Sequence, residues 1–321
     1  MSEEGFDWVS ICTKAGSEFL SHALRAAAYI VLTATPVPKP MPFHPRSLLY
    51  VPATSARMLA SAGRRGADAL VLDLEDAIAP AQKEQARAML QPAIASLRGQ
   101  CPVLVRINAD TALAQADTEA ALQAGCDGLV IPKVESAADV QRIAALADIH
   151  GSPPVLLQAI VETPAGLLRL QDIARASPRL VSLAFGGEDF ATALGVAPTP
   201  QALAMPAQAV VIAAVAAGLH PVGLAGSIGG YADLAQFGEL ARLSRALGMQ
   251  GAACIHPAQL AAVHAAFVAS EEDLRQARDT VLAYEQALAQ GQGAVAVGGR
   301  MVDAPIAERA RQLLRSAGEA A

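Results

Sequence analysis

From residue 46 onward, short apolar runs alternate with longer alanine-rich segments of helical character. This alternation predicts repeated βα units and a parallel sheet. The predicted strands cover residues 48–51, 69–73, 103–107, 128–131, 155–160, 181–185, 221–224 and 252–255. Eight such units predict an α/β fold, a closed (β/α)₈ TIM barrel over residues 42–265. The seventh strand is the weakest, because the glycines of PVGLAGSIGG also suit a loop. Its loss would leave an open doubly wound sheet.

The two ends of the chain differ from the predicted barrel. Residues 1–41 form an N-terminal extension with a short apolar stretch followed by prolines. The stretch is too short to span a bilayer and follows acidic residues, so we expect neither a membrane span nor a secretory signal. Met41 is a possible start of the protein, which would make residues 1–40 dispensable, and a tethered helix is the alternative. Residues 266–321, with SEEDLRQARDTVLAYEQAL after Ser270, predict a C-terminal helical extension.

Composition excludes several classes of protein. The 321 residues are 53% hydrophobic, enough for one large core, and the net charge of -6 argues against nucleic acid as a partner. An anionic ligand would need a local cluster of Arg and Lys. The four cysteines form no C-x-x-C pair, so neither zinc nor a disulfide framework is indicated, and we expect a cytoplasmic protein.

Three of the apolar runs end in carboxylates, in LVLDLEDA, LQAIVET and LAFGGEDF. An ionised carboxylate at the edge of a core is costly unless it is paired or binds a cation. Oxygen ligands without histidine or cysteine favour Mg²⁺, with Mn²⁺ as a substitute. Glu162 and Asp189, at neighbouring strand ends, are the candidate metal ligands. The alternative is that they are structural acids paired with Arg or Lys.

Polar residues follow nearly every predicted strand, and the chemistry of a (β/α)₈ barrel collects at the carboxyl ends of its strands. Among the acids after the second strand, Glu75 is the candidate site residue, since the three cannot all be ligands. Arg106 either contacts substrate or only neutralises the acids. His256 suits a packed loop histidine better than a base. The polar residues at the predicted strand ends are Asp73, Glu75, Asp76, Arg106, Asn108, Lys133, Glu135, Glu162, Thr163, Glu188, Asp189, Ser227 and His256.

Eight ordered motifs carry a family resemblance: RSLLYVPA, DLEDAIAPAQKEQAR, VRIN, PKVE, ETPAG, FGGEDF, IHPAQ and VDAPIAERAR. They cover residues 46–311 and resemble the citrate lyase β-subunit family of the aldolase and citrate lyase superfamily. The resemblance implies a barrel, a C-terminal segment packed on a neighbouring subunit, and a homotrimer or hexamer. It also implies that Glu162 and Asp189 hold Mg²⁺, that Arg106 contacts substrate oxygens, and that Asp303 acts as acid or base in the adjacent subunit.

The implied activity is that of a Mg²⁺-dependent carbon–carbon lyase. Its substrate would be a 3-hydroxyacyl-CoA thioester of the malyl, citramalyl or citryl type, cleaved to a keto acid and acetyl-CoA. A thioester hydrolase and a citrate lyase subunit acting on a carrier-protein thioester are the alternatives. Glu75, Arg106 and Glu162 would contact the acyl group. For the CoA phosphates, Arg46 and Lys83 are the first candidates, ahead of Arg57, Arg64 and Arg65.

Overall fold

The computed structural model describes residues 43–149 and 155–319. Expectations for residues 1–41 fall outside this range. Eight parallel strands form one sheet in the order β7-β6-β5-β4-β3-β2-β1-β8. Their bounds are β1 Ser47–Pro52, β2 Ala69–Asp73, β3 Val103–Arg106, β4 Gly128–Ile131, β5 Leu156–Val161, β6 Leu180–Phe185, β7 His220–Gly223 and β8 Ala252–Cys254. The predicted set of strands is confirmed, with ends displaced by a residue or two.

The sheet curves until its two edge strands meet. A parallel bridge joins Val222 of β7 to Gly251, just before β8, and Gly223 N donates to Gly251 O at 2.9 Å. The barrel is therefore nearly closed, as predicted, and the open doubly wound alternative is wrong. The glycine-rich segment of the seventh unit divides in two, because residues 220–223 form the strand and residues 224–230 form the loop after it.

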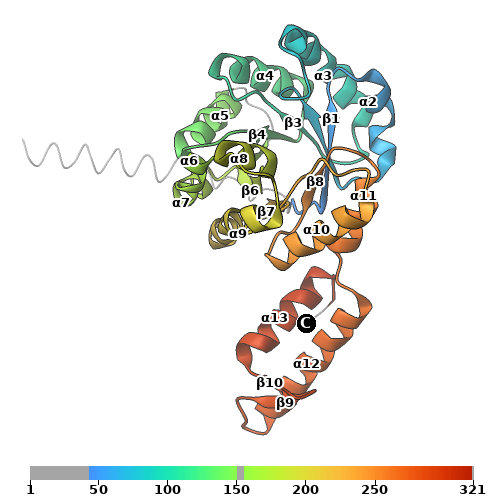
Figure 1. The fold of residues 1–321 in the computed structure, drawn as a ribbon, viewed down its shortest axis with the longest axis vertical. Helices are drawn as coiled ribbons and strands as arrows, with labels where there is room; N and C mark the ends of the chain where they lie inside the picture. Colours follow the sequence, from blue (N-terminus) through green and yellow to red (C-terminus); the bar gives the residue numbers. More distant parts are fainter. Residues whose placement is uncertain (1–42, 150–154, 320–321) are drawn as a thin grey trace, which may run out of the picture. The chain divides into compact units, whose positions relative to one another are not determined.

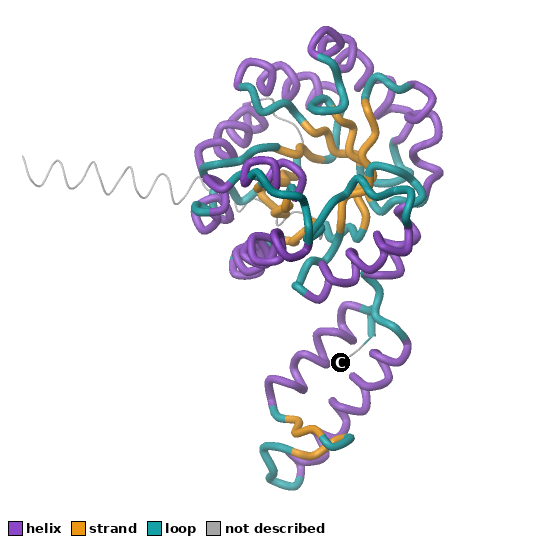
Figure 2. The backbone as a smooth tube through the Cα atoms, in the orientation of Figure 1, coloured by secondary structure: helices purple, strands orange, loops and turns teal. Residues whose placement is uncertain are grey.

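A ring of helices surrounds the strands (Figures 1 and 2). Side-chain caps begin several of them, as when Asp110 accepts from Ala112 N and Leu113 N at the start of α4. The helices are α2 Ala56–Ala62, α3 Lys83–Leu97, α4 Thr111–Ala124, α5 Ala137–Ile149, α6 Pro164–Leu167, α7 Leu170–Ala174, α8 Gly187–Leu194, α9 Pro200–Ala216, α10 Leu234–Ala246 and α11 Gln259–Ala266. Two 3₁₀ turns, η1 Gly63–Arg65 and η2 Pro80–Gln82, precede β2 and α3.

Alternate residues of each strand supply two apolar layers. Outward side chains such as Leu70 and Leu157 pack beneath the helices, whereas Leu104, Ile160 and Val222 belong to a cluster of inward residues. Both layers exclude water, which is the largest favourable term in folding such a barrel. The inward apolar layer lies directly beneath the polar residues at the carboxyl ends of the strands.

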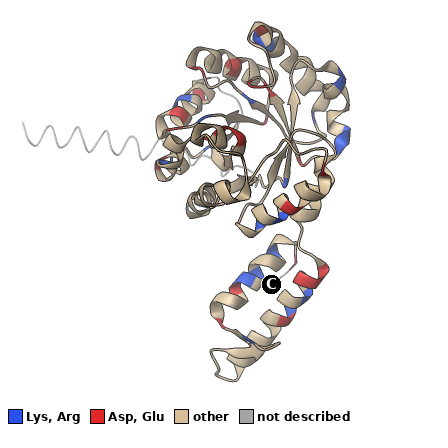
Figure 3. Ribbon diagram, in the orientation of Figure 1, with Lys and Arg blue, Asp and Glu red and all other residues tan. Residues whose placement is uncertain are grey.

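The C-terminal segment is a hairpin of helices with a small sheet at its tip. It comprises α12 Glu271–Ala289, β9 Val295–Val297, β10 Arg300–Val302 and α13 Ala304–Ser316. Ser270 and Asp273 form a capping box at the start of α12. Leu274, Val281 and Leu314 belong to a core made only of residues of this segment. Both signs of charge are interspersed along its helices (Figure 3). Among the described helices, none is long and apolar enough to cross a membrane.

Candidate active site

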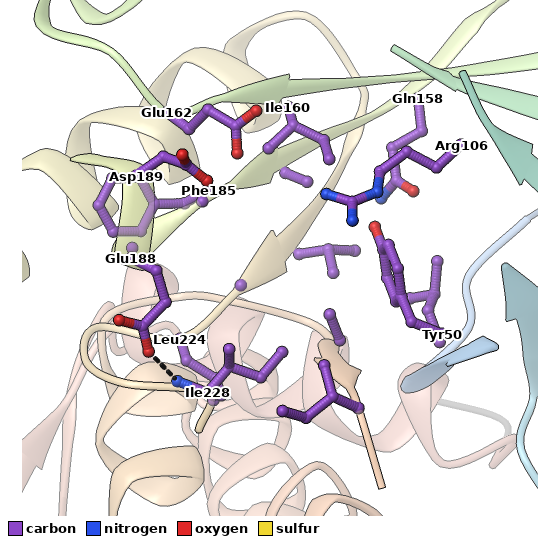
Figure 4. A pocket seen from close by; sticks show the side chains of 18 of the residues that line it. Tyr50, Arg106, Gln158, Ile160, Glu162, Phe185, Glu188, Asp189, Leu224 and Ile228 are labelled. Carbon is purple, nitrogen blue, oxygen red and sulfur yellow. Dashed lines mark hydrogen bonds between the residues drawn. The ribbon is translucent and has the colours of Figure 1, made fainter. Parts of the chain in front are cut away.

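A cavity of about 220 Å³ opens at the carboxyl ends of the strands (Figure 4). Glu162 and Asp189 lie together on one side of it, and Arg106 lies across from them. Most of the remaining wall is apolar, with Ile160, Phe185 and Val222 among its residues. The cavity therefore joins an anionic pair, one cation and a hydrophobic wall in a single space.

Glu162 follows β5 and is 3% exposed. Its Oε1 accepts a hydrogen bond from Lys133 N at 2.7 Å. A Cβ atom on Gly186 would lie 2.2 Å from Oε2, so the first glycine of FGGEDF is required by the close approach of this carboxylate. Burial, together with the nearby charge of Asp189, raises the pKa of Glu162 to about 8. A cation bound between Glu162 and Asp189 would therefore stabilise both carboxylates in their ionised form.

Asp189 lies in the first turn of α8, whose sequence begins directly after β6. The next residue, Phe190, is 2% exposed and anchors this turn in the core. The carboxylate of Asp189 lines the cavity beside that of Glu162. Oxygen donors on two adjacent, buried carboxylates suit a hard cation. In the described part of the chain, no group of three or more His, Cys, Asp or Glu side chains could hold a metal, so a cation here would take its remaining ligands from substrate and water, as Mg²⁺ commonly does.

Arg106 ends β3 and is held by three acids. Its Nε donates to Asp73 Oδ1 at 2.8 Å and its Nη2 to Asp73 Oδ2 at 2.6 Å. Nη1 lies 2.8 Å from Glu75 Oε2 and 3.1 Å from Asp76 Oδ2. The contact with Glu75 is an ion pair without hydrogen-bond alignment. Burial lowers the pKa of Arg106, but the bonds to Asp73 outweigh it and the net direction is upward, so the guanidinium is a permanent cation. Its planar fork is fixed in place, with the guanidinium over the ring of Tyr50.

Glu75 lies behind this cation, outside the residues that line the cavity. Its Oε1 accepts from Lys133 Nζ at 2.7 Å. Burial raises the pKa of Glu75, and Arg106 and Lys133 oppose that rise. Lys133 adopts a φ of 50°, which directs its backbone N to Glu162 and its ammonium to Glu75. The geometry gives Glu75 a positioning role, whereas its direct contact with substrate stays a prediction.

Lys83 does not face an open site. Its Nζ donates to Leu74 O at 2.7 Å, Glu75 O at 2.6 Å and Asn108 Oδ1 at 2.7 Å. These bonds use all three ammonium protons. Asn108 is in turn fixed by Asp117, which is fully buried. The geometry therefore does not support Lys83 as a ligand of CoA phosphates, and indicates instead that it clamps the turn after β2.

Three of the candidate arginines lie at the wrong end of the barrel. Arg46 precedes β1 and forms a two-point ion pair with Asp68, with bonds of 2.9 and 3.0 Å. Arg64 and Arg65 lie in η1, shortly before β2. Residues that precede parallel strands lie opposite the cavity, so the geometry does not support a role for these three with the ligand. Arg57, in the first turn of α2 after β1, is on the same face as the cavity.

The loop after β7 is attached to the site by Glu188. The Oε1 atom of Glu188 accepts from the Ser227 hydroxyl and, at 3.1 Å, from Ile228 N. Glu188 also lines the cavity, and one of its two carboxylate oxygens holds this loop. His256 stacks on Tyr231 at 5.2 Å and caps its own turn by accepting from Ala258 N. The side chain is exposed, so His256 is a loop histidine stacked on a neighbour and not a packed one, and its alternative role as a base stays a prediction.

Sequence reasoning missed two cavity residues, Tyr50 and Gln158, both inside strands. Tyr50 lies in RSLLYVPA, where the pattern does not distinguish it from the apolar residues of the strand. Gln158 could have been predicted as a site residue from the sequence LLQAIV, because an amide inside an apolar run must be hydrogen-bonded or face a cavity.

Comparison with known proteins confirms the family resemblance. The family model described as HpcH/HpaI aldolase/citrate lyase matches residues 46–257. A (3S)-malyl-CoA thioesterase of Cereibacter sphaeroides is 37% identical over 85% of this chain and 95% of its own length. An L-malyl-CoA/beta-methylmalyl-CoA lyase of the same species is 35% identical over 87% and 96%. The crystal structure of the protein CitE from Mycobacterium tuberculosis, in complex with magnesium, acetoacetate and coenzyme A, matches with a TM-score of 0.71 and 31% identity, over 87% of this chain and all of that one.

Proposed function

Because this chain belongs to the HpcH/HpaI aldolase/citrate lyase family, we propose that it cleaves, and in reverse forms, a carbon–carbon bond of a 3-hydroxyacyl-CoA thioester. The substrate is of the malyl, citramalyl or citryl type, and the products are a keto acid and acetyl-CoA. One observation carries the proposal: the paired carboxylates of Glu162 and Asp189 face the guanidinium of Arg106 across one cavity. That arrangement suits a small oxygen-rich anion held between a cation site and a fixed donor.

The cation is Mg²⁺, with Mn²⁺ as a substitute, and Glu162 and Asp189 hold it. The CitE structure with magnesium supports this choice for the family fold. When bound, the ion would lower the pKa of the substrate hydroxyl and stabilise the alkoxide that forms from it. Glu162 Oε2 is the free ligand atom, because Oε1 is occupied by Lys133 N.

The side chains of this protein supply orientation and charge. Arg106 binds the keto-acid oxygens through the donors that Asp73 leaves free, and Asp73 keeps its fork in one plane. In the cleavage step the substrate hydroxyl gives its proton to water, the carbon–carbon bond breaks, and the bonding electrons form the enolate of acetyl-CoA. The enolate carbon then takes up a proton, so the two transfers balance.

We assign the acid at that carbon to Asp303 of an adjacent subunit. Asp303 caps α13, where its Oδ1 accepts from Ile306 N at 3.3 Å, and it is not among the residues that line the cavity of its own chain. An exposed apolar stripe on α9, formed by Met205, Ile212 and Val215, supports an oligomer, because monomers rarely leave such a surface uncovered. We expect the trimer or hexamer implied by the family resemblance.

The thioester is that of CoA, as the CoA complex of CitE supports. Among the arginines predicted for its phosphates, Arg57 is the one that the geometry favours, since it follows β1 on the face of the cavity. The apolar wall formed by Leu224, Ile228 and Ile255 suits the uncharged pantetheine arm.

Complementation between two inactive variants tests whether Glu162 of one subunit and Asp303 of its neighbour form one active site. Glu162→Gln and Asp303→Asn each remove one half of it, so each variant alone is expected to be inactive. Co-expression in equal amounts should restore about one quarter of wild-type activity, because one in four pairings joins an intact Glu162 to an intact Asp303 in a cyclic oligomer. The lyase rate of the purified mixed oligomer is the measurement. A mixture as inactive as its parents would show that Asp303 does not act across subunits.

Affinity for Mg²⁺ should depend steeply on pH. The metal must displace a proton from Glu162 below its pKa of about 8, whereas above that pH the carboxylate is already ionised. The association constant, measured by calorimetry, should therefore fall about fivefold from pH 8 to pH 7, by about tenfold per pH unit below pH 7, and level off above about pH 8.5. An affinity that stays constant from pH 6.5 to 8.5 would contradict the assignment of Glu162 as a ligand.

Hydrolysis of the same thioesters is the second candidate, favoured by the 37% identity to a (3S)-malyl-CoA thioesterase. Keto acid is a product of the lyase alone. The direct experiment is release of glyoxylate from malyl-CoA and of pyruvate from citramalyl-CoA with Mg²⁺. Release should stop on chelation and in Asp189→Asn. It should persist in Glu135→Gln, which alters an exposed acid on the same face of the barrel.

A further inference from the structure

The cavity extends below the Glu162–Asp189 pair into the barrel. Gln158 and Glu162 lie four residues apart on one side of β5, which separates their Cα atoms by about 13 Å along the strand. Ile160 lies between them, and Leu48, Ala184 and Val222 complete an apolar wall. On the side of the cavity away from Glu162 and Asp189, the polar side chains of Gln158 and Tyr50 lie beside Arg106 (Figure 4).

The amide of Gln158 has a defined orientation. Ser182 Oγ donates its single proton to His220 O at 2.8 Å, so it can only accept from Gln158, whose Nε2 lies 3.0 Å away. Gln158 lines the cavity, and Oε1 is the amide atom that this contact leaves without a partner. The residue is 1% exposed, and Oε1 has no hydrogen-bond partner in the described part of the chain. A buried acceptor left unpaired is destabilising, which indicates that a donor from a ligand or a water belongs there.

The neighbours of Oε1 restrict what that donor can be. The Tyr50 hydroxyl and the Arg106 guanidinium point toward the same part of the cavity (Figure 4). Burial raises the pKa of Tyr50 and Arg106 opposes the rise, with the net direction upward. The Tyr50 hydroxyl therefore stays protonated and can donate a hydrogen bond. A hydroxyl group suits all three neighbours, because it can donate to Gln158 and accept from Tyr50 or Arg106.

We propose that this floor, formed by Gln158 and Tyr50, is a specificity subsite for a hydroxyl group on the side chain of the keto-acid half of the substrate. The substrate class is then a 3-hydroxyacyl-CoA whose carbinol carbon bears a hydroxymethyl group. This assignment rests on the proposed lyase function, since it takes the keto acid to be held between the Glu162–Asp189 pair and Arg106. A water molecule fills the same place when the side chain is hydrogen or methyl.

Two keto acids of equal size test the subsite. Hydroxypyruvate and 2-ketobutyrate differ by a hydroxyl in place of a methyl group. In condensation with acetyl-CoA and Mg²⁺, kcat/KM should favour hydroxypyruvate by about 10- to 100-fold in the wild type. Gln158→Met, which conserves volume, should reduce that ratio to within about threefold of unity. Gln171→Met, which alters an exposed glutamine in α7, should keep the wild-type ratio.

The results that would contradict the subsite can be told apart from those that would contradict the lyase function. A wild-type ratio near unity, or one that survives in Gln158→Met, would overturn the subsite, and the wild-type ratio needs no variant to fold. A higher kcat/KM for oxaloacetate than for hydroxypyruvate would show that the subsite binds a carboxylate and not a hydroxyl group, and would equally overturn the proposal. If no keto acid condenses, the lyase proposal fails, and calorimetry of the two acids on the Mg²⁺-loaded protein decides the subsite separately. Tighter hydroxypyruvate binding in the wild type but not in Gln158→Met would then support it, and equal binding would refute it.

Discussion

Glu162→Gln is expected to stabilise the metal-free protein at pH 8 by about 2 kcal/mol and to lower kcat/KM by on the order of 10³-fold. The two effects have one cause. The folded protein keeps Glu162 in a buried place beside Asp189, where its charge is uncompensated until a cation binds. Function therefore requires a carboxylate that the fold alone disfavours.

The sign follows from the pKa of Glu162, which is about 8 in the folded state and higher than the ordinary value of 4.5. The folded state binds this proton more tightly than the unfolded state does. Its contribution to stability is complete below about pH 4.5 and is lost as the pH rises through 8. A full loss would amount to about 5 kcal/mol. We expect less in Glu162→Gln, because an amide oxygen accepts the bond from Lys133 N more weakly than a carboxylate does.

Thermal unfolding with and without Mg²⁺ checks this prediction. At pH 8 the variant should melt about 4–8 °C above the wild type without metal, and the difference should vanish near pH 5. Added Mg²⁺ should raise the melting temperature of the wild type only. Glu135→Gln, which alters an exposed acid, serves as the control: its melting temperature without metal and its response to Mg²⁺ should both equal those of the wild type. Equal melting temperatures of the variant and the wild type at pH 8 would show that Glu162 is not a strained acid.

Arg106→Lys is expected to lower kcat/KM by about 10²-fold although the charge is conserved. A lysine ammonium cannot bind both oxygens of Asp73 and still present a donor in a fixed plane. It also loses the contact with the Tyr50 ring. The defect should appear mainly in kcat, because the charge that Arg106 stabilises is greatest in the transition state. Steady-state kinetics of keto-acid formation supply both constants.

Arg46→Lys is the matched control, since Arg46 makes the same two-point bond to Asp68 at the other end of the barrel. Loss of that pair should alter stability slightly and leave kcat and KM within about twofold of wild type. A raised KM for the CoA thioester in Arg46→Lys would reinstate Arg46 as a phosphate ligand. An unchanged kcat in Arg106→Lys would reduce Arg106 to a structural partner of the acids.

The fold was predictable because its signals are local and repeated. Each strand is a short, largely apolar run, most have a polar residue at or soon after their end, and the glycine-rich seventh unit still formed a strand over residues 220–223. Strand pairing and closure then follow from the right-handed βα crossover. The placement of Glu162, Asp189 and Arg106 on one face was predictable for the same reason, since all three follow or end parallel strands.

Contacts between side chains distant in sequence were not predictable from the pattern. Lys83 follows DLEDA closely, which suggested a ligand, yet its ammonium is used by Leu74 O, Glu75 O and Asn108. Arg46 was assigned from its proximity to the first strand, although residues before a strand lie opposite the site. The orientation of the Gln158 amide depends on Ser182 and His220, which only the barrel brings together.

The measurement that tests the proposed function most directly is the ratio of keto acid to free thiol formed from malyl-CoA and citramalyl-CoA with Mg²⁺. The lyase predicts keto acid in proportion to substrate consumed, no free thiol, and loss of activity in Glu162→Gln and on chelation. Free thiol without keto acid would contradict it and establish the thioesterase. Turnover of neither substrate would contradict both and direct the search to carrier-protein thioesters.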